Sequence, residues 1–236
     1  MRYRTALMRY ATRLLGRGDP CCAKIWFVGI EDTAHLRSMS DLNTVGGRSY
    51  MTMNGCAGMR TAVYTIISKV VMGLRGQTNN SAWRAYHDKE LFSRNSGVFL
   101  TNLYPLGKRL EKEWPGNYRR WLGMTCEQYY RSLQQGTLPR FRHLRVQHCR
   151  YNPPLTICCG KRHWKHFSAC FALDGVEYED VGRFRCYRNA GFIMTEFFRS
   201  TRMSDACIRK LVCWLNEEGL NPFVGVKYEQ LDQAKG

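Results

Sequence analysis

The chain has 236 residues, of which 44% are hydrophobic, so it is not a disordered protein and fits one domain with a substantial core. Its 36 Lys and Arg residues exceed its 19 Asp and Glu residues, and the net charge of +17 favours a polyanionic partner. We expect that partner to be nucleic acid, because arginine outnumbers lysine and its fork of donors suits phosphate. An anionic membrane surface is the alternative, although no apolar run is long enough for a membrane span.

The cysteines and the start of the chain indicate a cellular compartment. The 11 cysteines are scattered without a Cys-x-x-Cys pair, which favours reduced thiols in a cytoplasmic protein. An iron–sulfur cluster from distant cysteines is the weaker alternative, and we expect no metal or other cofactor. Residues 1–20 are basic and lack a continuous apolar core, which predicts an N-terminal helix and not a signal peptide.

Predicted helices and strands alternate along the chain. Helical apolar spacing indicates the helices, and short apolar runs bounded by Gly or Pro indicate buried strands. Helix caps are expected at Ser81, Thr125 and Ser204. In chain order the expected elements are helix Arg2–Arg17, strand Ala23–Gly29, loop Asp32–Asn54, helix Gly58–Leu74, helix Ser81–Ser93, strand Gly97–Leu103, helix Thr125–Gln135, strand Leu155–Cys159, helix Lys161–Phe171, a hairpin in Asp174–Arg188, strand Gly191–Thr195, helix Met203–Glu218 and a loosely defined tail over 221–236.

This alternation predicts a single α/β domain over residues 1–236, with four mostly parallel strands between layers of helices. Ligands of such sheets bind beyond the carboxyl ends of the strands. The candidate site therefore lies in the loops that follow Gly29, Leu103, Cys159 and Thr195. The basic stretch Arg140–Arg150 is interleaved with aromatic residues, which suits contact with a nucleic-acid backbone, although a solvated charge run fits as well.

Four short motifs follow the four predicted strands. They are Gly29-Ile30-Glu31-Asp32, Thr101-Asn102-Leu103-Tyr104-Pro105, Cys158-Cys159-Gly160-Lys161-Arg162-His163-Trp164 and Met194-Thr195-Glu196-Phe197-Phe198-Arg199-Ser200. In this order the chain resembles the uracil-DNA glycosylase superfamily from about Lys24 to about Leu215. Each motif is weak alone, and the ordered set is moderately specific. The resemblance implies a three-layer α/β/α sandwich around a four-stranded, mostly parallel sheet.

The resemblance implies that Glu31 occupies the position of the family's water-activating carboxylate or amide. A carboxylate there stabilises the positive charge that develops on the sugar as an N-glycosidic bond breaks. Asp32 replaces the family's proline and is the second catalytic candidate. Asp is also a good helix cap, so we assign catalysis first to Glu31.

Base binding is expected at three positions. Asn102 matches the family's base-reading asparagine, whose amide offers a donor and an acceptor to a flipped base, although an Asn that simply ends a strand is nearly as common. Tyr50 lies near the place of the family's stacking aromatic, and it fits packing equally well. Thr33 is small where uracil-specific members carry a bulky aromatic residue, which suits a base with a 5-substituent.

DNA contacts are expected on the third and fourth motifs. The family's histidine after the fourth strand is absent, and Thr195-Glu196 takes its place. Of Phe197 and Phe198, one is expected in the core and one as a wedge in the base stack, and Arg199 and Ser200 contact the leaving group or a phosphate. Lys161, Arg162 and His163 begin a helix that faces phosphate or simply solvent; a zinc site at His163 would need further ligands.

We therefore expect a monomeric, monofunctional DNA glycosylase that leaves an abasic site and has DNA, not a membrane, as its partner. The chain also looks similar to bacterial antiphage glycosylases that remove glucosylated 5-hydroxymethylcytosine from phage DNA. The alternatives are a uracil or mismatch repair glycosylase and a non-catalytic nucleic-acid-binding protein on the same fold. A metal-dependent nuclease would need more clustered carboxylates than Glu31, Asp32 and Glu196 provide.

Overall fold

The computed structural model describes residues 16–30, 50–51, 53, 55–59, 61–108, 113–199 and 201–224, together with Thr5 and Tyr10. The predictions for Glu31, Asp32, Thr33, Ser200 and the tail beyond 224 lie outside the described residues. Within the described part, no helix is both long and apolar enough to cross a membrane.

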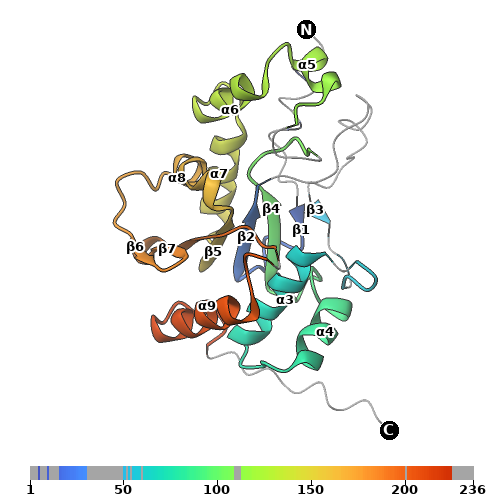
Figure 1. Cartoon of the computed structure of the whole chain (residues 1–236), viewed down its shortest axis with the longest axis vertical. Helices are drawn as coiled ribbons and strands as arrows, with labels where there is room; N and C mark the ends of the chain where they lie inside the picture. The colour runs from blue at the N-terminus through green and yellow to red at the C-terminus, as the bar shows by residue number, and fades with distance from the viewer. Residues whose placement is uncertain are drawn as a thin grey trace.

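The described strands form one mixed sheet of eight strands in the order β3-β1-β4-β2-β5-β8-β7-β6. The four strands in its middle run parallel to one another and coincide with the four predicted strands. They are β2 (Ile25–Gly29), β4 (Val98–Asn102), β5 (Leu155–Cys159) and β8 (Phe192–Thr195). The α/β class is confirmed, and the sheet is wider than the four strands expected (Figure 1).

The additional strands lie at the two edges of the sheet. β1 (Gly16–Arg17) and β3 (Tyr50–Met51) form one edge, and the hairpin of β6 (Glu179–Val181) and β7 (Phe184–Tyr187) forms the other. The hairpin confirms the expectation for Asp174–Arg188. The prediction that the first helix extends to Arg17 is wrong, because Gly16 and Arg17 pair with β4 in an antiparallel ladder. Gly16 permits this approach, since a Cβ there would lie 2.4 Å from the Phe99 ring.

The helices agree with the sequence where a cap residue and an apolar stripe occur together. Thr125 and Ser204 cap their helices as predicted, and Thr125 forms a capping box with Gln128. The cap expected at Ser81 is wrong, because the Asn79 side chain accepts the hydrogen bond from the Ala82 N–H and the helix begins earlier. The helices and short 3-10 turns are α3 (Ala62–Leu74), α4 (Asn80–Lys89), α5 (Gly116–Leu122), α6 (Cys126–Gln134), α7 (Arg140–Tyr151), η1 (Lys161–His163), α8 (Trp164–Phe171), η2 (Arg188–Ala190) and α9 (Asp205–Glu217).

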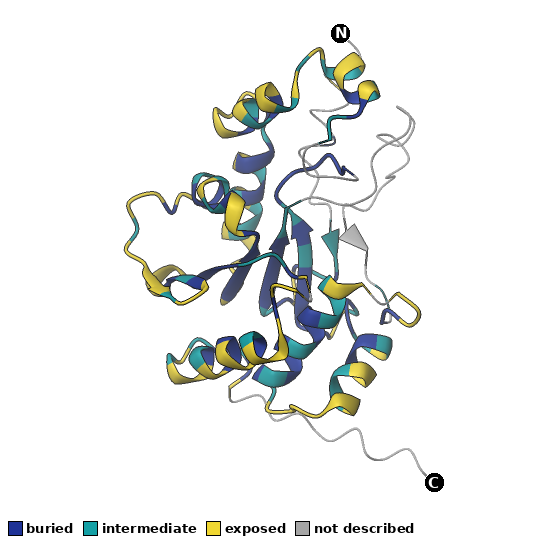
Figure 2. Cartoon of the chain, in the orientation of Figure 1, coloured by how far each residue is buried: buried dark blue, intermediate teal, exposed yellow. Residues whose placement is uncertain are grey.

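Helices lie on both faces of the parallel strands, and these strands are buried at the centre of Figure 2. Side chains alternate along a strand, so β2 sends Ile25 and Phe27 to one core and Trp26 and Val28 to the other. The first core includes apolar residues of α3 and α9, and the second includes those of α6, α7 and α8. Two separate cores thus hold the parallel strands in place and leave their carboxyl ends at one edge of the sheet.

The basic stretch 140–150 forms helix α7 and does not present all its charge to solvent. Arg140 is fully buried, and Arg145 donates to the main-chain oxygens of Ala169 and Cys170 at 2.6 and 2.8 Å. Phe141 and Leu144 lie in the core. Side chains of this helix therefore bind β4 on one side and α8 on the other. Only its exposed residues remain for the contact with a nucleic-acid backbone that was expected here.

Candidate functional site

The first and second motifs meet where β2 and β4 end. Gly29 and Asn102 are register partners in the parallel ladder. Beyond them, the Leu103 N–H donates to the Gly29 oxygen and the Tyr104 N–H donates to the Ile30 oxygen, each at 2.8 Å. The pairing therefore continues past both strands, up to the last described residue before Glu31.

The Asn102 side chain lies directly against Gly29. A Cβ built on Gly29 would lie 2.6 Å from the Asn102 Oδ1 atom, which is far inside van der Waals contact. Glycine at this position is therefore what allows the Asn102 amide to sit over the end of β2. Asn102 is partly exposed, so its amide remains accessible from the edge of the sheet. The structure places this predicted base-reading residue at the strand-end site.

The buried guanidinium of Arg140 binds the carboxyl end of β4. It donates to the main-chain oxygen of Asn102, to that of Leu103 at 3.4 Å and to the Thr101 hydroxyl at 3.3 Å. Desolvation lowers the pKa of Arg140 to about 10, which still leaves it charged at neutral pH. The sequence did not mark Arg140 as a site residue; its place in a basic run concealed its role.

The third motif connects the first motif to the fourth. Gly160 has a φ of +141°, and a Cβ there would lie 2.6 Å from the Cδ1 atom of Ile30. Its N–H donates to the Thr195 oxygen at 3.0 Å, and the Trp164 indole N–H donates to the same oxygen at 3.2 Å. The turn after β5 therefore touches the ends of both β2 and β8, so all four predicted motifs share one edge.

The fourth motif separates the roles expected for its two phenylalanines. Phe198 is buried in the first core, with its ring centroid 5.9 Å from that of Phe27. Phe197 is only partly buried, and the Arg199 guanidinium carbon lies 5.0 Å from its ring centroid. Phe198 is thus the core residue of the pair, and Phe197 with exposed Arg199 forms the solvent-accessible part of the motif.

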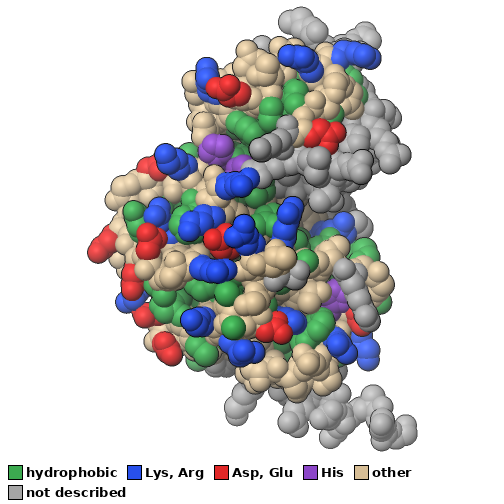
Figure 3. Space-filling model, viewed as in Figure 1, with side chains coloured by type: hydrophobic (Ala, Val, Ile, Leu, Met, Phe, Trp, Pro, Cys, Tyr) green, Lys and Arg blue, Asp and Glu red, His purple; other side chains and the backbone are tan. Residues whose placement is uncertain are grey.

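Of the three basic residues of the third motif that were predicted to contact DNA, two are on the surface and one is not. Lys161 and Arg162 are exposed, and the Lys161 amine lies 3.9 Å from the Glu196 carboxylate. His163 is buried, and its Nδ1 atom lies 2.8 Å from the Tyr104 hydroxyl. The expectation that its ring faces phosphate or solvent is therefore wrong. Figure 3 shows Lys and Arg side chains gathered across the middle of one face, with Asp and Glu side chains among them.

Of Tyr50, the residue expected to stack on the base, the structure describes only the backbone. Its backbone forms β3, which pairs with β1 and lies at the edge of the sheet beyond β4. Its side chain lies outside what the structure describes, as do all of Glu31, Asp32, Thr33 and Ser200.

A second group of polar side chains adjoins the same edge, and only His163 among them was predicted from the sequence as a site residue. It comprises Tyr104, Tyr130, His163, His166 and Lys108, whose residues come from the loop after β4, from α6 and from the η1–α8 segment. The Lys108 amine is buried and lies 2.5 Å from the Tyr130 hydroxyl. Burial, and secondarily the neighbouring His163, lowers the pKa of His166 to about 4, so this imidazole is neutral at pH 7.

Metal chemistry finds no support in the described side chains. Within those residues, no three His, Cys, Asp or Glu side chains are placed to hold a metal ion. Burial raises the pKa of the Cys170 thiol to about 12, and Cys158 and Cys159 are also buried, which disfavours their reactive thiolate forms.

The comparisons with known proteins give no family assignment. No protein-family model matches the chain, and no curated protein is similar enough to match it.

Proposed function

We propose that the protein is a DNA glycosylase that excises a modified base flipped out of the helix and leaves an abasic site. The observation that carries this proposal is the convergence of four separate segments at one sheet edge. Gly29 and Ile30 meet Asn102 and Gly160 there, and Gly160 meets Thr195. A base-excision site needs a carboxylate, a base-reading amide and DNA contacts within one crevice, and these are the residue types in the four motifs.

The proposed chemistry assigns one role to each motif. Glu31, or Asp32 beside it, orients a water molecule and stabilises the sugar as the bond to the base breaks. Asn102 pairs with the edge of the base, and the small residue Thr33 leaves space for a 5-substituent. Phe197, Arg199 and Ser200, with Lys161 and Arg162, contact the DNA. Under this proposal the parallel strands and the helices on both faces form a three-layer sandwich of the uracil-DNA glycosylase type.

The substrate we favour is glucosylated 5-hydroxymethylcytosine in phage DNA, which would make the protein an antiviral defence enzyme acting in the cytoplasm as a monomer. Uracil or mismatched thymine is the alternative within the same reaction class. Three duplexes carrying these bases, followed by heating in alkali to cut abasic sites, distinguish the two. Cleavage of the glucosylated duplex alone supports defence, and cleavage of the uracil or mismatch duplex alone supports repair.

A non-catalytic nucleic-acid-binding protein is the second candidate, and the net charge of +17 with exposed Lys161, Arg162 and Arg199 favours it. The substitution Glu31→Gln separates the two, because it removes a charge at the proposed catalytic position and keeps the size of the side chain. An enzyme loses turnover and keeps DNA binding. A wild-type protein that binds all three duplexes and cleaves none supports the second candidate.

A further inference from the structure

A small hollow lies between the β6–β7 hairpin and helix α9, which are neighbours in Figure 1. It has a volume of about 280 Å³ and a mainly apolar surface. The hairpin lines it with Val181 and Phe184, which are register partners in the ladder of β6 and β7. Helix α9 lines it with Cys207, Lys210 and Trp214. None of the roles proposed for the four motifs uses this hollow.

Two of the side chains that line the hollow are aromatic. Phe184 is buried, and Trp214 packs against the same core while it remains partly exposed. Cys207, Lys210 and Trp214 lie three and four positions apart along α9, so they share the helix face that is turned toward the hairpin. Exposed aromatic rings are stacking platforms for planar ligands, and every nucleobase has a flat face. The hollow therefore suits one planar ring system.

Exposed cations surround the hollow. Arg183 and Lys210 line it, and both are exposed. The Arg183 guanidinium donates to the main-chain oxygen of Arg202 at 3.2 Å, which ties the hairpin to the segment that follows β8. Arg199 and Arg202 of that segment are exposed as well. The hollow is therefore connected through Arg183 and Arg202 to the basic end of the fourth motif.

The carboxylates of the hairpin and of α9 do not cancel these cations. Four carboxylates already bind other basic side chains: Glu179 and Glu218 bind Arg188, Asp180 binds Arg185, and Asp205 binds Lys69. Within the described residues, none of the four cations around the hollow is in an ion pair, and of the α9 acids only the exposed Glu217 binds no cation. A ligand that carries negative charge beside a flat ring is complementary to this surface.

A strand of DNA combines these two properties, because its phosphates alternate with flat bases. The net charge of +17 attracts such a polyanion. A base that is paired and stacked in a duplex cannot enter a hollow, so the strand has to be unpaired at this point. A lipid headgroup supplies the negative charge without the ring, which leaves the aromatic lining of the hollow unexplained.

We propose that the hollow between the β6–β7 hairpin and α9 binds an unpaired nucleobase of a DNA strand, with Trp214 stacked on the base and Arg183 and Lys210 on the adjoining phosphates. This inference rests on DNA as the partner in the proposed function and adds a second base-binding site. Three strands of the sheet separate β7 from β4, which carries Asn102, so this base is a neighbour of the excised base along the strand. The protein therefore prefers single-stranded or locally opened DNA to a closed duplex.

Protection of a thiol tests the site without any substitution. Cys207 lines the hollow, whereas Cys213 of the same helix lines a different groove, between α3, α4 and α9. Trypsin separates the two cysteines, because it cuts after Arg209 and Lys210. A saturating single strand of roughly 15 thymidines, the upper range of single-strand site sizes, is expected to slow the alkylation of Cys207 by N-ethylmaleimide and to leave Cys213 unchanged. Peptide mass spectrometry measures both rates, and equal rates with and without the strand at Cys207 overturn the site.

The affinity for the same strand tests the stacked base. Trp214→Ala is expected to weaken binding at least about fivefold, the loss of one stacked base, and to leave the affinity for an abasic strand of equal length unchanged. Trp83→Ala is the matched control, since Trp83 of α4 is also partly exposed and packs against the same core. It is expected to weaken neither complex. Fluorescence anisotropy of end-labelled strands measures the affinities.

The cations supply a test that does not depend on the folding of Trp214→Ala. Lys210→Gln and Arg183→Gln change exposed side chains, and each is expected to lower the slope of log affinity against log salt by about 0.7, the value for one phosphate contact on a single strand. Lys89→Gln, at an exposed lysine that ends α4, is the control and keeps the wild-type slope.

The outcomes separate this site from the function on which it rests. Equal affinity losses in Trp214→Ala and Trp83→Ala, or unchanged slopes in both Lys210→Gln and Arg183→Gln, overturn the site and leave excision by the wild type untouched. Loss of binding to phosphatidylserine vesicles in Trp214→Ala, with DNA binding unaltered, assigns the hollow to a membrane and also overturns it. A wild type that protects Cys207 with the strand and cleaves no duplex supports the site and contradicts the glycosylase function. A wild type that binds no DNA overturns both.

Discussion

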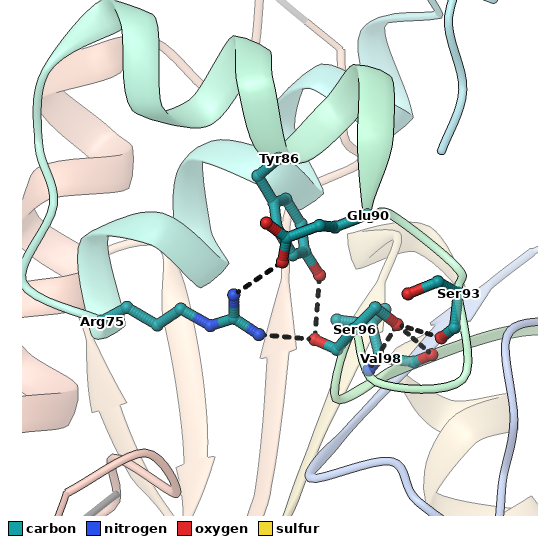
Figure 4. Close-up of polar contacts among 6 residues, drawn as sticks. All are labelled: Arg75, Tyr86, Glu90, Ser93, Ser96 and Val98. Atoms are coloured by element: carbon teal, nitrogen blue, oxygen red, sulfur yellow. Dashed lines mark hydrogen bonds and ion pairs between the residues drawn. The ribbon is translucent and has the colours of Figure 1, made fainter. Parts of the chain in front are cut away.

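An arginine side chain binds main-chain oxygens at each end of strand β4, and the two arginines do so in different ways. At the amino end, Arg75 donates to the Ser96 oxygen at 2.9 Å and pairs with the Glu90 carboxylate at 3.4 Å (Figure 4). The Tyr86 hydroxyl donates to the same oxygen. At the carboxyl end, buried Arg140 donates to the Asn102 and Leu103 oxygens and to the Thr101 hydroxyl.

The difference lies in where the partners come from and what they hold. The amino-end partners span Arg75 to Val98, so a short stretch of chain closes on itself and fixes the turn into β4 (Figure 4). Arg140 comes from α7, and the oxygens that it holds include the main-chain oxygen of Asn102, the residue proposed to read the base. One end of the strand is therefore anchored for stability, and the other is anchored so that an exposed amide keeps its position. The predictions below sharpen or break this contrast, from the largest expected effect to the smallest.

The largest effect is expected for Arg140→Met. The substitution leaves the oxygens at the end of β4 buried without their donor, and each unsatisfied group costs about 1–3 kcal/mol. We expect the free energy of unfolding to fall by roughly 3 kcal/mol or more, measured by urea denaturation, and base excision to fall with it. A loss below about 1 kcal/mol would show that Arg140 does not anchor the strand end.

Gly29→Ala tests the contact between β2 and Asn102. The new methyl group would lie 2.6 Å from Asn102 Oδ1 and must displace the amide. We expect excision to fall by at least about tenfold, with a stability loss of about 1–2 kcal/mol typical of overpacking.

Gly116→Ala is the control for this substitution. A Cβ on Gly116 meets no atom within 4 Å, and this glycine has no positive φ. It is expected to leave excision unchanged and to raise stability by at most about 1 kcal/mol, because alanine favours the helix over glycine. Full activity in Gly29→Ala would contradict the role given to Asn102.

Acid is expected to weaken the α7–α8 side of the molecule. Burial lowers the pKa of His143, His148 and His166 from the ordinary 6.5 to about 4. The unfolded chain then binds more protons between these values, so stability is complete above pH 6.5 and falls as the pH drops toward 4. Urea midpoints at pH 7.5, 5.5 and 4.5 measure the loss, and hydrogen exchange locates it. We expect exchange in acid to become faster first at Asn102–Tyr104, on the α7 side, and later at Ser96–Val98. The opposite order would contradict this prediction.

Arg75→Met should have the smallest effect. The Ser96 oxygen keeps the hydrogen bond from Tyr86, and the released Glu90 side chain is 43% exposed and can be hydrated, so we expect a loss of about 1 kcal/mol. Excision should remain at the wild-type rate, since this end of β4 is remote from Asn102. A loss of stability equal to that of Arg140→Met would erase the distinction between the two ends.

The sequence predicts the parallel strands well because they are short, apolar and bounded by Gly or Pro, and all four lie where expected. It also predicts the helices that carry both a cap and a clean apolar stripe, such as α9. It misses α7, whose buried face combines Phe141 and Leu144 with a buried arginine. A charged residue in the core breaks the pattern from which helices are read.

The candidate site is predictable only in part, for a related reason. Asn102 could be marked because it ends a strand, and strand ends share an edge of a parallel sheet. The partners of Tyr104 and Arg140 could not, because their contacts join residues 59 and 38 positions apart in the sequence. His163 was expected on the surface from its basic neighbours, and only the fold reveals that its ring turns inward to Tyr104.

The most direct test of the account is the excision reaction with Glu31→Gln beside the wild type, on duplexes that carry glucosylated 5-hydroxymethylcytosine, uracil or mismatched thymine. The account predicts alkali-labile sites at one of these bases with wild type, insensitive to a chelator, and their loss in Glu31→Gln while DNA affinity is kept. Wild-type protein that binds the duplexes and releases no base from any of them, or Glu31→Gln and Asp32→Asn that both excise at the wild-type rate, would contradict it.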